Sequence, residues 1–247
     1  MLQLDLTTPP NIDDLPGSDE TPVDNEDQNF VPNVLLFVLE YLWRTREDWY
    51  FGVDMALYYP SDKGKTLSIV PDGFLSVGVK RRKDGKSRKS YFTWKEQVIP
   101  QFVLEVVSET KGGEYDDKLS IYQSLGVKYY VIYNPTFWQR DRHEPLEIYK
   151  LESDRYQLQQ GEPYGMPEIG LGLGRCTQSP DPYNREVLGW YDLNGEAYPT
   201  MHEQLVLATE RAEAAERNEK LAEQRAARLA QFLRSQGFDP DNLPASD

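Results

Sequence analysis

The strongest constraint on the fold is a strand–helix–strand pattern in the middle of the chain. Residues 102–108, FVLEVVS, have the continuous apolar character of a buried strand. A helix is expected to begin at Asp116 or Asp117 and to run to Leu125, and the segment KYYVIYN at 128–134 is the next expected strand. A helix between two strands of one sheet forms a crossover, so this order predicts a crossover unit inside a mixed sheet.

The first of these strands contains an ionisable residue, Glu105, among apolar neighbours. Side chains alternate between the two faces of a strand, so Glu105 shares a face with Val103 and Val107. A lone carboxylate on an apolar face is costly to bury. A bound cation, a basic side chain or a catalytic role would each offset that cost.

Two other residues fit a site around Glu105. Asp72 follows Pro71 at a break in an apolar segment, and Lys118 lies near the start of the helix that follows the Glu105 strand. If the two acidic strands are neighbours, their carboxylates converge and supply the oxygen ligands that Mg²⁺ or Mn²⁺ takes. Such a metal lowers the pKa of a bound water, and a lysine beside it stabilises charge on a phosphate. Asp72 and Glu105 are therefore predicted metal ligands, and all three residues are predicted to be catalytic.

The remaining elements of the core are expected on either side of these residues. The spacing of apolar residues predicts a helix at about 31–46, a strand at 49–59 and an interrupted strand over 67–79. A hairpin is expected over 145–160. The segment GLGLG at 170–174 lacks the spacing of a nucleotide-binding loop and is interpreted as part of a strand and turn.

Composition and charge divide the chain into three regions. Residues 1–29 carry eight acids and no base, and are expected to form an acidic extended lead-in. Residues 30–200 are expected to form the folded domain, and 201–247 a C-terminal coiled-coil helix and tail. The net charge of −14 argues at first against nucleic acid as a partner, but more than half of it lies in residues 1–29, which leaves the middle nearly balanced.

The C-terminal region carries Leu and Ala at alternating spacings of three and four residues over 203–236, interrupted by Glu219. A helix of that length would be about 50 Å long and too narrow in its apolar face to be stable alone. A homodimeric coil is the first expectation. Docking on the chain's own core and pairing with another protein remain alternatives.

Other classes of protein are disfavoured by what the sequence lacks. No apolar run approaches the roughly 18 residues that span a bilayer, so no membrane association is expected. The single cysteine, Cys176, suits a reducing cytoplasm. With only two histidines, the chain cannot assemble the usual structural zinc site alone, and it has no G-x-S-x-G nucleophile motif.

Four motifs occur in order along the chain: VPDGFLSV (70–77), VLEVVSET (103–110), DDKLSIYQSLGVKYYVIYNP (116–135) and EIGLGLG (168–174). As an ordered set they resemble the PD-(D/E)xK nuclease superfamily, and more closely the Uma family of restriction-type endonucleases. The resemblance implies a restriction-endonuclease-like α/β fold, with a mixed sheet flanked by helices. It also implies a metal-dependent endonuclease that hydrolyses phosphodiester bonds in nucleic acid, with DNA favoured over RNA. A dimer would suit the cutting of both strands.

One position departs from the superfamily pattern, which places a lysine two residues after the second acid. That position is Val107 in this chain. The resemblance implies that a lysine from the following helix serves instead, and Lys118 occupies that place. Lys118, Tyr122 and Leu125 share a helical face, so the lysine can reach the Glu105 strand while Leu125 packs.

Four further residues are candidates for the same site. Asp54, in an apolar segment, is either another ligand or the partner of a nearby base. Glu40 would bind metal as helix acids do in some relatives. Ser108 and Tyr122 are placed to hydrogen-bond the site or a phosphate. Each could equally have a purely structural role.

A basic run over 80–89 is either a solvated loop or a finger that grips phosphate. It holds seven bases and one acid, without a pattern that would read bases. The alternative to an enzyme is a nuclease fold retained as a binding or assembly module, which the Ala-rich helix, the net charge and the displaced lysine favour. The candidate phosphate contacts are Lys80, Arg81, Arg82, Lys83, Lys86, Arg88 and Lys89.

Overall fold

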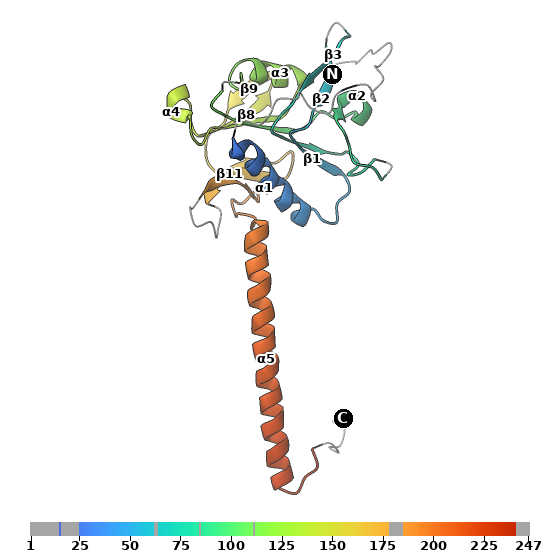
Figure 1. Cartoon of the computed structure of the whole chain (residues 1–247), viewed down its shortest axis with the longest axis vertical. Coiled ribbons are helices and arrows are strands. Elements are labelled where there is room, and N and C mark those ends of the chain that lie inside the picture. The colour runs from blue at the N-terminus through green and yellow to red at the C-terminus, as the bar shows by residue number, and fades with distance from the viewer. Residues whose placement is uncertain are drawn as a thin grey trace. The chain divides into compact units, whose positions relative to one another are not determined.

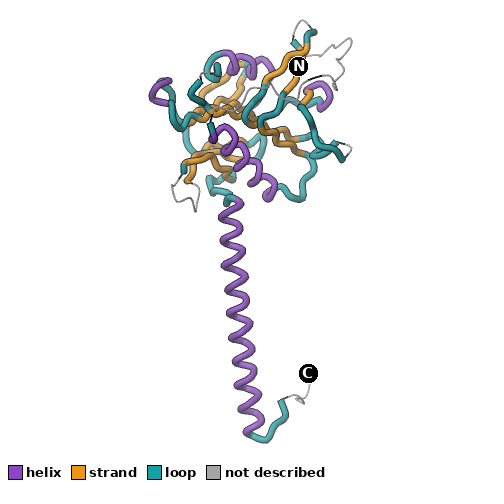
Figure 2. The backbone as a smooth tube through the Cα atoms, in the orientation of Figure 1, coloured by secondary structure: helices purple, strands orange, loops and turns teal. Residues whose placement is uncertain are grey.

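The computed structural model divides the chain into two units, Met1–Met201 and His202–Asp247. Most of the expected lead-in over 1–29 lies outside the described residues. Figure 1 shows the order of the elements, and Figure 2 shows that the strands belong to the first unit. The described residues are 15, 25–61, 64–83, 85–110, 112–177 and 185–240.

The centre of the first unit is a six-stranded mixed sheet with the order β1-β4-β6-β7-β8-β9. Within it β6 and β7 are parallel, and the other neighbouring strands are antiparallel. The mixed α/β architecture expected from the sequence is therefore confirmed. The strands are β1 (Trp49–Val53), β4 (Gly73–Val77), β6 (Phe102–Val106), β7 (Tyr129–Tyr133), β8 (Leu146–Glu152) and β9 (Arg155–Leu158).

Two three-stranded sheets accompany the large sheet, in the orders β3-β2-β5 and β10-β11-β12. The GLGLG segment enters β11, so its interpretation as strand and turn is confirmed. Two helices of this unit, α2 (Thr93–Glu96) and α4 (Trp138–Asp141), are single turns. The strands of the small sheets are β2 (Leu57–Pro60), β3 (Thr66–Ile69), β5 (Tyr91–Phe92), β10 (Tyr164–Met166), β11 (Leu171–Thr177) and β12 (Glu186–Tyr191).

The predicted crossover is present. The helix α3 (Asp117–Leu125) follows β6 and leads into the parallel strand β7. It ends at Gly126, whose φ of 83° is the left-handed conformation that glycine adopts without steric cost. The predicted hairpin is also confirmed, with its turn at Ser153 and Asp154 between β8 and β9.

Two sequence predictions need correction. The first helix, α1, spans Glu26–Leu42 rather than 31–46, because the Asn25 side chain caps it by accepting the backbone N–H groups of Asp27 and Gln28. Residues 26–29, expected to be extended, are therefore helical.

The strand expected over 49–59 is two strands in different sheets. Asp54 lies between β1 and β2 with a φ of 46°, in the left-handed region that strands exclude. The chain turns at this residue, and the apolar segment after it joins the sheet of β3 and β5 instead of continuing beside β4.

Strand β6 separates two apolar layers. Its residues Phe102, Leu104 and Val106 belong to the core that includes the buried face of α1. Val103 and Val107 belong to a second core that includes Tyr122 of α3. Alternation places Glu105 in this second layer, under the crossover helix.

The second unit consists of the helix α5 (Met201–Ser235), so the predicted C-terminal helix is confirmed. None of its described residues is buried, and Leu205, Leu229 and Phe232 are among its exposed apolar side chains. Its pairing as a coiled coil stays a prediction. Among the described residues, no helix combines the length and apolar character needed to cross a membrane.

Candidate active site

The register of β4 against β6 brings the two predicted carboxylates together. Gly73 lies opposite Leu104 in this antiparallel pair, which places the preceding residue, Asp72, beside Glu105. Residues directly opposite in such a pair share a face, with Cβ atoms about 4.5–5.5 Å apart. Asp72 is tied to the neighbouring strand as well, because its Oδ2 accepts the backbone N–H of Val106 at 2.6 Å.

The Glu105 carboxylate is held by two side chains of α3. The side chain of Glu105 is only 1% exposed. Its Oε2 accepts a hydrogen bond from Lys118 Nζ at 2.8 Å, and its Oε1 accepts one from the Tyr122 hydroxyl at 2.6 Å. Lys118 and Tyr122 are four residues apart and therefore lie one above the other on the helix. This arrangement accounts for a carboxylate in an apolar layer, because both oxygens are satisfied.

A third acid, Glu114, lies beside Lys118 and was not singled out in the sequence. It is 6% exposed, and its Oε1 is 3.8 Å from Lys118 Nζ. Its Oε2 accepts the backbone N–H of Gly112 at 3.2 Å. The spacing of four residues between Glu114 and Lys118 was the available signal, since oppositely charged residues at that spacing commonly interact.

Burial dominates the electrostatics of the site. It raises the pKa of Asp72 well above its usual range, and the neighbouring Glu105 raises it further. Burial also raises the pKa of Glu105, although Lys118 and Tyr122 oppose this effect. Burial lowers the pKa of Lys118, but the attraction of Glu105, Asp72 and Glu114 together leaves that pKa raised.

The charges of these groups do not balance. With Asp72, Glu105 and Glu114 ionised, three negative charges surround the single positive charge of Lys118, a formal total of −2. Burial and the neighbouring acids disfavour this fully ionised state, as the raised pKa of Asp72 shows. A divalent cation between the carboxylates would offset that effect and stabilise their ionised forms.

The donor set fits a metal that is only partly enclosed by protein. Carboxylate oxygens are the ligands of Mg²⁺ and Mn²⁺, and Mg²⁺ commonly keeps several waters. In the part of the chain that the structure describes, no group of three or more His, Cys, Asp or Glu residues is arranged to hold a metal. If Asp72 and Glu105 hold an ion, water and substrate would have to fill its other positions.

The structure does not bring Glu40 to these carboxylates. Glu40 lies on α1, which packs against the apolar layer on the other face of β6, and its carboxylate pairs with Arg81. Asp54 is closer, because its backbone N–H donates to the Asp72 carbonyl at 3.2 Å, but its side chain is exposed. Ser108 is buried, and its hydroxyl donates to the Thr110 carbonyl at 2.9 Å.

Two arginines of the basic run have structural partners. Arg88 has a side chain only 5% exposed and forms an ion pair with Glu96 at 3.2 Å. Arg81 pairs with Glu40, and its guanidinium lies 3.7 Å from the centroid of the Trp49 ring. These contacts fix the two side chains against the folded unit, while the other five bases of the run remain candidates for phosphate contact.

Together, the mixed sheet and the crossover helix define an α/β protein of the restriction-endonuclease-like fold class. The chain belongs to the Uma2 family, described as "Putative restriction endonuclease", whose family model matches residues 21–174. The resemblance inferred from the four motifs is therefore confirmed.

A solved structure gives a weaker comparison. It is the crystal structure of a protein from Anabaena variabilis ATCC 29413 described as a putative nuclease belonging to DUF820. The two chains are 11% identical, with a TM-score of 0.42, and the match covers 59% of this chain and 74% of the other. No curated protein matches the chain.

Proposed function

We propose that the chain is a metal-dependent endonuclease that hydrolyses phosphodiester bonds in nucleic acid, with DNA as the favoured substrate. The observation that carries the proposal is that Asp72 lies opposite Glu105 on the neighbouring strand, while Lys118 donates a hydrogen bond to Glu105. Membership of the Uma2 family supports the same reaction class.

Each residue has a defined part in this proposal. Asp72 and Glu105 would hold Mg²⁺ or Mn²⁺, which supplies an activated water and a counter-charge for the phosphate. The Val106 N–H fixes the Asp72 carboxylate, and the Tyr122 hydroxyl fixes that of Glu105. Lys118 places a positive charge beside the attacked phosphate, where transition-state charge develops.

Glu114 keeps the lysine in place. Its carboxylate is the second acidic partner of Lys118 Nζ, at 3.8 Å. When Glu105 shares its oxygens with a metal, Glu114 still offers the ammonium a negative neighbour. The lysine thereby stays charged and close to the reacting phosphate.

The test combines metal binding with cleavage. Titration of Mg²⁺ or Mn²⁺ should raise the melting temperature, because a ligand at 100 times its Kd stabilises a folded protein by about 2.7 kcal/mol. Asp72→Asn and Glu105→Gln should lose this shift and the nicking of plasmid DNA. Glu152→Gln, which neutralises an exposed acid at the end of β8, is the matched control and should keep both. Nicking by both site variants at the wild-type rate would refute the assignment.

A second candidate function is a nuclease fold that binds or assembles without cutting. The observation that favours it is the position two residues after Glu105, where Val107 is 2% exposed and packs in the apolar core. The same titration separates the two functions. A binding module would show neither metal-dependent stabilisation nor nicking, whereas an enzyme would show both.

A further inference from the structure

The basic loop is braced against the folded unit by a buried arginine. Arg88 donates to the backbone carbonyl of Arg81 at 2.9 Å and to that of Lys80, and it pairs with Glu96. Its guanidinium also lies 4.3 Å from the centroid of the Tyr50 ring. One side chain thus joins both ends of the loop to the body of the protein.

A second set of contacts holds the start of the loop. The backbone N–H of Gly78 donates to the Asp48 carbonyl at 2.7 Å, and that of Arg81 donates to the Glu47 carbonyl at 2.8 Å. The Arg81 side chain pairs with Glu40. These contacts hold Gly78 and Arg81 in place before any partner arrives, which reduces the entropy cost of binding at this part of the loop.

The braced loop presents cations to solvent. Lys80, Arg82 and Lys86, which we name the basic platform, are exposed. Within the described residues, no carboxylate lies within ion-pair distance of these three side chains. In a chain whose net charge is −14, these three cations form a local concentration of positive charge.

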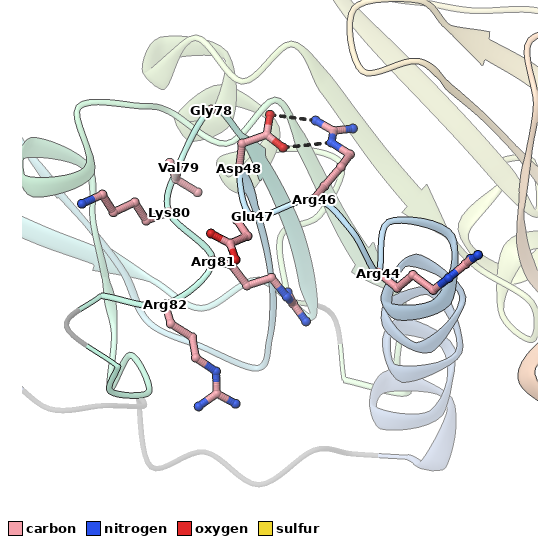
Figure 3. Close-up of a pocket in the computed structure, with 9 residues that line it drawn as sticks. All are labelled: Arg44, Arg46, Glu47, Asp48, Gly78, Val79, Lys80, Arg81 and Arg82. Atoms are coloured by element: carbon pink, nitrogen blue, oxygen red, sulfur yellow. Dashed lines mark hydrogen bonds and ion pairs between the residues drawn. The ribbon is translucent and has the colours of Figure 1, made fainter.

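The platform borders an open pocket of about 730 Å³ at the end of β4. Five of the nine lining residues are bases and two are acids, one of which, Asp48, is bound by Arg46. Figure 3 shows this ion pair and the Lys80 and Arg82 side chains extending away from the pocket wall in different directions. The arrangement suits several separate anionic groups better than one small anion. The lining residues are Arg44, Arg46, Glu47, Asp48, Gly78, Val79, Lys80, Arg81 and Arg82.

The platform is separate from the carboxylate site. Asp72 immediately precedes β4, and the pocket follows the other end of that strand. From Asp72 to Val77 the chain takes five steps of about 3.4 Å each, which span about 17 Å. An anion on the platform therefore cannot be the phosphate held beside Asp72.

We propose that the basic platform binds the phosphate backbone of nucleic acid, at nucleotides outside the cleavage site. Repeated phosphates match separated cations, and such contacts provide affinity without sequence specificity. A membrane surface fits less well, because Val79 of the pocket is only 3% exposed and offers no apolar side chain for insertion. The proposal rests on nucleic acid as the ligand of the proposed function, but on neither the metal nor cleavage.

The test measures binding of a fluorescent duplex to the full chain in EDTA, by anisotropy over a range of salt concentrations. Each phosphate contact contributes about 0.9 to the slope of log K against log salt. The triple variant Lys80→Gln, Arg82→Gln and Lys86→Gln should bind more weakly, with a slope shallower by up to about 2.7. Its melting temperature should be unchanged, because the three side chains are exposed.

The control variant removes the same amount of charge elsewhere, through Lys65→Gln, Arg155→Gln and Lys220→Gln at three exposed positions. It should retain the wild-type slope. If both variants lost the same affinity and slope, the effect would be due to net charge alone and the proposal would be overturned. A wild-type chain that does not bind the duplex would also overturn it. Vesicles of anionic lipid that bind with the same dependence on the platform would overturn it in favour of a membrane. Metal-dependent melting tests the proposed carboxylate site, and duplex binding in EDTA tests the basic platform. Either proposal can therefore fail while the other stands.

Discussion

Replacement of Lys118 by methionine should expose the energetic cost of the Glu105 carboxylate. Methionine keeps much of the lysine stem, so the packing of α3 is largely retained while the ammonium is lost. Glu105, 1% exposed, would then keep the Tyr122 hydroxyl but lose its positive partner. The variant therefore leaves a buried charge only partly compensated.

The loss of stability expected for Lys118→Met follows from the burial of Glu105 and from its remaining hydrogen bond. Removal of one partner of a buried ion pair costs about 3–5 kcal/mol. Lys118 is 24% exposed and Tyr122 still donates to Glu105, so we expect a smaller loss of about 2–3 kcal/mol at pH 7. In a unit of this size, that corresponds to a fall in melting temperature of roughly 4–12 °C.

The loss should depend on pH. Burial already raises the pKa of Glu105, and removal of Lys118 raises it further. A carboxyl group whose pKa is higher in the folded state contributes stability below its unfolded pKa and loses that contribution as pH rises through the folded pKa. The difference between Lys118→Met and the wild type should therefore shrink as pH is lowered from 8 towards 5.

Urea unfolding at several pH values, on both single variants and their combination, measures this coupling. Glu105→Gln removes the charge that Lys118 neutralises, so the double variant should be less destabilised than the sum of the two single variants. Lys65→Met, at an exposed position, controls for the loss of a surface charge. Additive losses that do not change with pH would refute the buried ion pair.

Three further predictions concern individual contacts. Without metal, Asp72→Asn should be more stable than the wild type at pH 8, because burial and Glu105 raise the pKa of Asp72 and make its ionised form costly. Its stability should also vary less with pH. Urea midpoints from pH 5 to 8 test this, and a pH profile identical to that of the wild type would contradict it. Tyr122→Phe should lose about 1–2 kcal/mol, because Glu105 Oε1 loses its donor, and a change below 0.5 kcal/mol by urea unfolding would count against that bond. Arg88→Met should lower the free energy of unfolding by about 2 kcal/mol, as measured by thermal melting. Arg88→Lys should restore only part of that stability, because lysine lacks the planar guanidinium that makes several hydrogen bonds at once. Full restoration by lysine would show that charge alone holds the loop.

The elements that the sequence identified are those whose signals are local. The β6–α3–β7 crossover follows from an apolar strand, a helix ending at Gly126 and a second apolar strand, each visible within a few residues. The functional importance of Glu105 was visible because an acid interrupted an apolar run. Lys118 was placed near it by its position at the start of the following helix and by the family resemblance, and α3 does bring its ammonium to that carboxylate.

What the sequence did not reveal depends on contacts between distant segments or on single backbone angles. The turn at Asp54 divides one apolar segment between two sheets, and the only local sign of it is the aspartate, a residue that adopts the left-handed conformation more often than most. Arg88 resembled the other bases of its loop, and only the folded chain shows that Glu96 and Tyr50 surround it. Glu40 was judged from its helix alone, without knowing which face of the sheet that helix covers.

The alternation along β6 has a consequence for which insertions and deletions this chain can tolerate. One residue added or lost before Glu105 within the strand would turn the carboxylate towards the layer beneath α1 and aim an apolar side chain at Lys118. The connection to α3 follows the backbone hydrogen bond from Val107 to the Tyr133 carbonyl, so changes in its length after Val107 would leave the orientation of Glu105 intact. Length variation among related chains should therefore be concentrated after the strand and excluded from it.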